Sequence, residues 1–155
     1  MNNLAYAYDV PRGPDQLALT SYTAVSVPTF AVPELAAERP RWEGKVVSRL
    51  VELLDLPERW DGRDAKRVQT QTAYYASTFL GAVCSPSTAE PQIVPTIAGG
   101  LQIEWHKNNV DIELELEGPY TMHLFIEYLD DGRIIDRPMQ GRDADFMDAL
   151  AVISA

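Results

Sequence analysis

The chain has 155 residues, a length that suits one domain. Hydrophobic residues make up 46% of the chain and charged residues 23%, which are the proportions of an ordinary globular protein rather than a disordered one. The formal net charge is −10, from 23 acidic and 13 basic residues, and this argues against a protein that binds nucleic acid or an anionic membrane through a basic surface.

The single cysteine, Cys84, excludes an internal disulfide framework and a zinc site built from several cysteines. The first residues lack the pattern of a signal peptide, and no apolar run reaches the length of a membrane-spanning helix. With one free thiol and no export signal, we expect a cytoplasmic protein.

Residues 1–40 hold five of the eleven prolines and show no sustained hydrophobic period. Proline removes a backbone donor and restricts the residue before it, so long helices and central strands are disfavoured there. Two short stretches, 18–23 and 24–27, are candidates for edge strands. We expect residues 1–40 to form a proline-rich arm that lies over a single domain of residues 41–155.

Two amphipathic helices are expected in the first part of that domain. Apolar residues recur at spacings of three and four over residues 42–54, and Pro57 should end this helix. The second helix is predicted to begin near Asp61 or Asp64, either of which could cap it. It should end at residues 84–86, which read Cys-Ser-Pro.

From residue 93 onward the hydrophobic period changes from about 3.6 to 2, which predicts strands. Turns at residues 98–100, 108–109, 117–119 and 131–132 would connect them as an antiparallel meander of four or five strands. Pro95 restricts the first strand to an edge of the sheet. A short amphipathic helix over residues 143–153 should follow. Because one face of the sheet is apolar, we expect a two-layer α+β fold with the helices on that face.

The predicted turn lengths set the cross-strand pairs. They place Ile97 opposite Leu101 in the first hairpin and Trp105 opposite Ile112 in the second. In the third hairpin they place Leu114 opposite Met122. Each of these pairings keeps the apolar side chains of neighbouring strands on one face of the sheet.

The opposite face of this sheet is predicted to be polar and acidic. Residues 101–131 contain eight acidic residues, with Lys107 as their only Lys or Arg. The pairing puts Glu104 opposite Glu113, a destabilising arrangement of like charges, and it puts Glu113 opposite His123. Three interpretations are open, namely a solvated face, a surface for a basic protein that includes Phe125, and a metal or proton-transfer site.

Two residues outside the sheet also admit more than one interpretation. Trp60 could anchor a partner, or it could fill the space between the first two helices while Asp61 caps the second. Cys84 could serve as a nucleophile only beside a base, and it otherwise packs as a small hydrophobic residue.

Two segments carry a resemblance to a known family. Residues 56–62 read LPERWDG, and residues 95–105 read PTIAGGLQIEW. These segments resemble those of a family of small uncharacterised bacterial and phage proteins, over about residues 45–130. The resemblance implies a prokaryotic or phage source, and it carries no known activity with it.

Common motifs of nucleotide binding, serine hydrolases and zinc proteases are missing from the sequence. We therefore expect a non-enzymatic protein-binding module without a cofactor, such as an inhibitor, antitoxin or immunity-type partner of a basic prokaryotic effector. Mimicry of nucleic acid in phage defence or counter-defence is a special case. The predicted partner surface comprises Glu104, Glu113, Glu115, His123, Phe125, Glu127 and Trp60.

Two other functions remain open. One is a metal-dependent hydrolase whose ligands or acid–base groups would be Glu104, Glu113 and His123. The other is a structural subunit of a phage or bacterial assembly, which would associate with copies of itself through the arm. Direct binding to nucleic acid or to a membrane is not expected.

Overall fold

The computed structural model describes residues 39–155. Backbone contacts group these described residues into one compact unit. The predicted proline-rich arm, with its candidate edge strands at 18–23 and 24–27, falls outside the described residues except for its last two positions. Its prediction is therefore untested.

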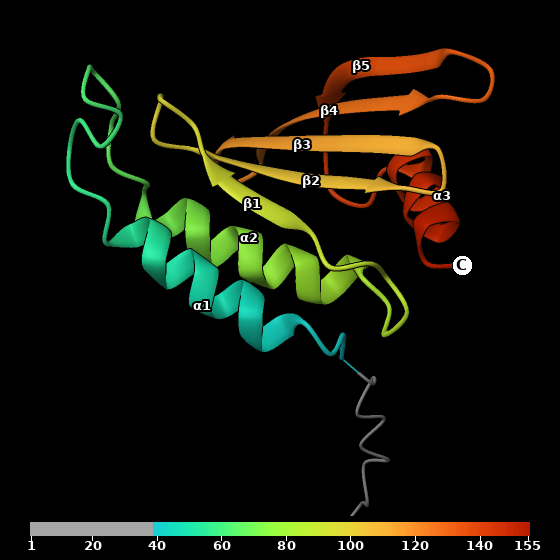
Figure 1. The fold of residues 1–155 in the computed structure, drawn as a ribbon, viewed down its shortest axis with the longest axis horizontal. Coiled ribbons are helices and arrows are strands. Elements are labelled where there is room, and N and C mark those ends of the chain that lie inside the picture. Colours follow the sequence, from blue (N-terminus) through green and yellow to red (C-terminus); the bar gives the residue numbers. More distant parts are fainter. Residues whose placement is uncertain (1–38) are drawn as a thin grey trace, which may run out of the picture. The chain divides into compact units, whose positions relative to one another are not determined.

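The described residues form three helices and five strands (Figure 1). In chain order these elements are α1 (Glu43–Leu54), α2 (Thr70–Val83), β1 (Gln92–Pro95), β2 (Leu101–Lys107), β3 (Val110–Gly118), β4 (Thr121–Tyr128), β5 (Arg133–Met139) and α3 (Ala144–Ile153). No helix among residues 39–155 is both long enough and apolar enough to cross a membrane.

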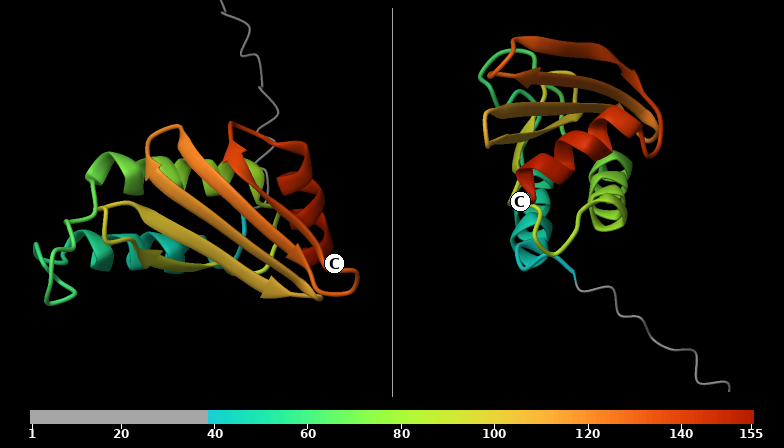
Figure 2. Two further views of the ribbon diagram at one scale, coloured as in Figure 1. Left: turned by 90° about the horizontal axis from the view of Figure 1, so that it is seen from above. Right: turned by 90° about the vertical axis from the view of Figure 1, so that its right-hand side faces the viewer.

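The five strands form one antiparallel sheet in the order β1-β2-β3-β4-β5, so the predicted meander is confirmed. All three helices lie on the same side of this sheet (Figure 2). The core fills the space between the two layers, with Trp105 from β2 and Phe146 from α3 among its largest buried side chains. β1 and β5 are the edge strands, which confirms the edge position predicted from Pro95.

The alternation of apolar and polar side chains along the strands explains which face of the sheet packs against the helices. Along β3 every second residue, from Val110 to Leu116, is buried against the helices, and the acidic residues between them point to the other side. β2 and β4 follow the same rule. The sheet therefore has one apolar face covered by helices and one polar face that no described helix covers.

The cross-strand register agrees with the predicted pairs in one hairpin and differs in two. Trp105 lies opposite Ile112, as predicted. In the first hairpin, however, Pro95 and not Ile97 lies opposite Leu101, because β1 ends early and residues 96–100 form a longer loop. Thr96 closes this loop: its N–H donates to the carbonyl of Gly100 (3.1 Å), and its hydroxyl accepts from the Gly100 N–H (3.0 Å).

The third hairpin departs from the prediction in the opposite direction, because its turn is shorter. Leu114 lies opposite Leu124 rather than Met122. Tyr120 adopts a φ of +65°, a value that permits a tight turn between Gly118 and Thr121, with an irregular register beside it. In both hairpins the error is two residues, a shift that leaves the side chains of the paired strands on their predicted faces. Ile97, which was predicted to lie on the apolar face, instead belongs to the loop and is exposed.

The start of α2 was predicted too early. The helix begins at Thr70, not near Asp61 or Asp64. The carboxylate of Asp61 instead accepts two N–H groups inside the connection between α1 and α2. Lys66 and Gln69 donate their N–H groups to carbonyls of the loop between β1 and β2, at 3.0 and 3.1 Å. These donors hold the connection against the sheet, and the helix begins only after them.

The other helix boundaries were predicted well. α1 ends before Pro57, and α2 ends at Val83. α3 is capped by Asp143, whose carboxylate accepts the N–H groups of Asp145 and Phe146. The same carboxylate makes a two-pronged ion pair with Arg137 of β5, so the cap also ties α3 to the sheet. This arginine holds the pKa of Asp143 below its ordinary value.

Candidate functional site

The candidate site is the polar side of the sheet, which we call the open sheet face. Its side chains come from alternate positions of β2 to β5, opposite in direction to the buried core residues. We define it by Gln102, Glu104, His106, Asp111, Glu113, Glu115, His123, Phe125, Glu127, Ile134, Asp136 and Pro138. Most of these side chains are partly exposed, and His106, Ile134, Asp136 and Pro138 are exposed.

Carboxylates face each other directly across the strands of this face. Glu104 lies opposite Glu113, as predicted, and Asp111 lies opposite Glu127. Like charges in such positions destabilise a sheet unless a counter-charge or solvent screens them. A cation or a positively charged surface would relieve the part of this repulsion that solvent does not screen.

His123 does not lie where the sequence placed it. The register puts His123 opposite Glu115, and Phe125 takes the predicted position opposite Glu113. The Nε2 atom of His123 lies 3.4 Å from a carboxylate oxygen of Asp136, on β5. This correction follows directly from the shorter turn at Tyr120.

The same correction removes the neighbouring placement on which the predicted metal site depended. Glu104 and Glu113 are cross-strand neighbours, but His123 is not beside Glu113. Within residues 39–155, no group of three or more His, Cys, Asp or Glu side chains is arranged to hold a metal ion. The predicted hydrolase site of Glu104, Glu113 and His123 therefore has no support in the geometry.

His106 is the histidine that contacts two carboxylates. Its Nδ1 atom lies 3.0 Å from Asp111, and its Nε2 atom lies 3.6 Å from Glu104. The hydrogen bond with Asp111 is the main cause that raises the pKa of His106, and Glu104 raises it further. A protonated His106 would neutralise part of the acidic row at this end of the face.

No lysine or arginine among the described residues forms an ion pair with a carboxylate of the open sheet face. The side chain of Gln102 donates to Glu113 at 3.1 Å, but it carries no charge. The Lys and Arg ion pairs of the described chain lie elsewhere, in α1 and its surroundings and at the start of α3. Only His106 and His123 can supply positive charge on the face itself.

Three members of the face, all on β5, were missed in the sequence. Ile134, Asp136 and Pro138 lie beside Glu127, Phe125 and His123 of β4, in that order. The residues of 133–139 alternate in burial: Ile135 and Arg137 are partly buried and Met139 is buried, while Ile134, Asp136 and Pro138 are exposed. The turn at residues 131–132 was predicted, but its register was not followed to the end of the strand.

Trp60 and Cys84 lie in other elements. Trp60 belongs to the connection between α1 and α2, where its indole N–H donates to the carbonyl of Lys66 at 3.2 Å. Cys84 follows α2 and packs against the core, and burial raises the pKa of its thiol to about 12. Since the thiolate is the reactive form, this cysteine is a poor nucleophile at neutral pH.

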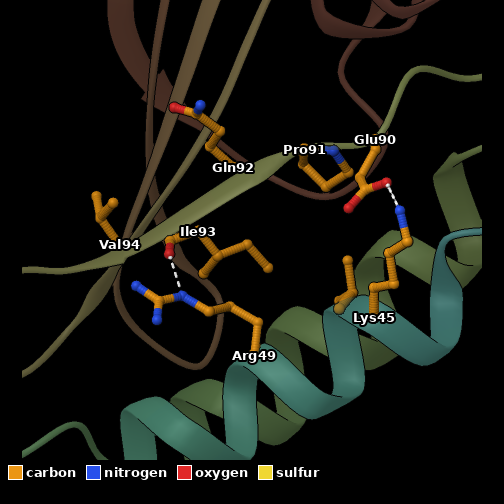
Figure 3. Close-up of a pocket in the computed structure, with 8 residues that line it drawn as sticks. Lys45, Arg49, Glu90, Pro91, Gln92, Ile93 and Val94 are labelled. Carbon is orange, nitrogen blue, oxygen red and sulfur yellow. Dashed lines mark hydrogen bonds and ion pairs between the residues drawn. The ribbon is translucent and has the colours of Figure 1, made fainter.

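A hollow of about 320 Å³ lies at the edge of the sheet between α1 and β1 (Figure 3). Its two cationic side chains are already engaged: Lys45 pairs with Glu90 at 2.7 Å, and the Nε atom of Arg49 donates to the carbonyl of Ile93 at 3.1 Å. The second contact occupies a backbone acceptor of the edge strand. We therefore assign a structural role to the contacts that line this hollow, because they connect α1 to β1 and cover part of the β1 edge.

Comparison with known proteins leaves the function to be judged from the site. A scan against protein-family models found no match, and searches of curated proteins and of solved structures found no significant match. The resemblance that residues 56–62 and 95–105 bear to small bacterial and phage proteins accordingly stays a prediction.

Proposed function

We propose that this protein is a non-enzymatic module that binds a basic surface of a protein partner through its open sheet face. The observation that carries the proposal is the set of carboxylates on β2, β3 and β4 with no lysine or arginine paired to them in the described chain. A partner that brings lysines or arginines to this face would replace like-charge contacts with favourable ones.

Apolar groups within the acidic face support the same function. Phe125 lies between Glu113 and Asp136 in one cross-strand row, and Ile134 lies beside Glu127. Protein interfaces combine a desolvated apolar centre with a polar rim, and aromatic residues are enriched in them. Phe125 would supply contact area, while the surrounding carboxylates would set the orientation of the partner.

The net charge of −10 would act at longer range, by steering a positively charged partner toward the protein. An effector that binds nucleic acid has such a surface, so an inhibitor, antitoxin or immunity-type role suits this chemistry. On β3 the carboxylates of Asp111, Glu113 and Glu115 follow one another on alternate residues. In the special case of nucleic-acid mimicry, this row would occupy the places of phosphates.

Charge reversal on the face tests the proposal. The full-length protein is immobilised, partners are captured from a lysate of its native host at low and high salt, and the affinity of the captured protein is measured. The variant Glu113→Lys/Glu115→Lys should weaken binding by at least about tenfold and reduce its dependence on salt, because the attraction has been reversed.

A matched control separates the face from the total charge. Asp64→Lys/Asp148→Lys changes the net charge by the same amount at exposed positions outside the open sheet face, and it should retain most of the affinity. The proposal fails if the two variants bind equally well. It also fails if no captured protein is released by high salt.

A further inference from the structure

The outer side of α2 carries no charged side chain. The helix reads TQTAYYASTFLGAV, while α1 and α3 each contain acidic residues. Its exposed positions include Gln71, Tyr74, Thr78 and Ala82, whose spacing of three and four residues places them on one side of the helix. A helix side that stays in water usually carries charged residues, so this surface is unusual in a chain with 23% charged residues.

An aromatic groove of about 650 Å³ runs beside this side of α2, between the helix and the turn that joins β3 to β4. Tyr74 and Tyr120 project from its walls, with 76% and 78% of their surfaces exposed. Tyr75 lies beneath them, with its ring 4.8 Å from the ring of Tyr120 and 6.0 Å from that of Phe79. The groove has no charged residue in its lining.

Tyr120 occupies its place at a conformational cost. Its φ of +65° lies in the left-handed region that side chains rarely adopt. The turn nevertheless holds a large aromatic ring at this position, in water and against Tyr75. Strain of this kind often marks a position that serves binding.

We infer that the outer side of α2 and the aromatic groove form the interface of a homodimer. In a twofold dimer the same patch of each copy meets itself, so a charged patch would face its own charge. Two copies with a net charge of −10 each repel one another, and the uncharged side of α2 is a surface through which they can approach without bringing charged side chains together. Tyr74 of each copy would supply a ring for the groove of the other.

This dimer would leave the open sheet face accessible, because α2 packs on the opposite face of the sheet (Figure 2). Each dimer would then present two acidic faces. A partner with two basic sites, or a partner that is itself a dimer, would be held more tightly by both faces than by one.

The mass of the full-length protein in solution tests the inference. At a protein concentration of about 100 μM, which exceeds the Kd of many weak dimers, we expect sedimentation and light scattering to give about twice the chain mass of 17.3 kDa. Tyr74→Glu should give the mass of one chain, because the two copies would then bring two like charges together at the contact. Ala82→Glu should do the same from a different position on α2.

The matched control is Val51→Glu, at a position of α1 that is 54% exposed, with circular dichroism used to verify folding of every variant. This variant should remain dimeric. A wild-type protein that has a single chain mass at the highest concentration would overturn the inference. So would a Tyr74→Glu variant that stays dimeric, or a Val51→Glu variant that dissociates. None of these results depends on whether the open sheet face binds a basic partner.

Discussion

His106 shows how a single residue responds to the charge of the open sheet face. It contacts Asp111 and Glu104, and these carboxylates hold its pKa above the ordinary value of 6.5. A raised pKa in the folded state means that the protonated form stabilises the fold. This contribution is fully present below pH 6.5, and it is lost as the pH rises through the folded-state pKa.

A comparison with His106→Asn measures that contribution. The wild-type protein should exceed the variant in free energy of unfolding at about pH 5.5, and the difference should shrink at about pH 8.5. Urea unfolding at the two pH values gives the difference directly. In Asp111→Asn, an NMR titration should show the pKa of His106 moving back toward 6.5. A difference in stability that grows with pH would contradict the assignment.

At the level of the elements, the loop between β1 and β2 is fixed by close contact with its neighbours. A Cβ atom added to Gly100 would lie 2.3 Å from the backbone oxygen of Leu116, in β3. Side chains at this distance force the backbone to move, and backbone in the middle of a sheet cannot move without losing ladder hydrogen bonds. The loop therefore requires glycine at this position for space.

Gly100→Ala should lower the free energy of unfolding by about 1–3 kcal/mol or more, the cost of overpacking a close-packed site. Gly44→Ala in α1 is the control, because a Cβ added there meets no atom within 4 Å. This control should be neutral or should stabilise the protein by up to about 1 kcal/mol, since alanine favours a helix. Urea unfolding measures both, and equal effects at the two positions would refute the close-contact explanation.

The elements also show what sequence patterns can and cannot predict. Hydrophobic period identified the strands and the faces to which their residues point, because a buried face tolerates no slip of one residue. A slip of two residues preserves both faces, so the patterns could not detect the errors at Ile97 and Met122. The length of each turn decided these registers. The first turn depends on a hydrogen bond to the Thr96 hydroxyl and the third on the positive φ of Tyr120, and both features arise only in the folded chain.

The same turn lengths explain which neighbours in the candidate site were predicted correctly and which were not. The pair of Glu104 and Glu113 was predicted correctly because the Asn108-Asn109 turn has a standard length, and both residues adopt the positive φ that this turn requires. The neighbours of His123 were wrong because they depended on the turn at Tyr120. The start of α2 was missed because long-range hydrogen bonds of Lys66 and Gln69 override the local capping signal of Asp61.

For the whole molecule, the excess of carboxylates makes electrostatic repulsion a general cost of folding. The net charge is −10, and carboxylates face one another at two places on the open sheet face. Compact states of highly charged proteins are destabilised by self-repulsion, and salt screens this repulsion. The stability of the protein should therefore increase with ionic strength.

The melting temperature should rise when the Debye length falls from about 30 Å in 0.01 M salt to about 3 Å in 1 M salt. Glu113→Lys/Glu115→Lys should show a smaller rise, because it removes part of the repulsion before salt is added. Thermal unfolding in sodium chloride checks both expectations. A melting temperature that falls with salt would mean that favourable ion pairs, and not repulsion, dominate the folded state.

Both outer strands of the sheet discourage the addition of another strand. In β1 the carbonyl of Ile93 is bound by Arg49, and in β5 Pro138 has no N–H to offer. A partner strand that paired along an edge would bind the backbone, which is the same in every protein. A partner on the open sheet face would instead bind side chains, which differ between proteins. Recognition could then be altered one side chain at a time on a scaffold that stays unchanged, so related proteins with this fold could differ in partner while sharing the same core.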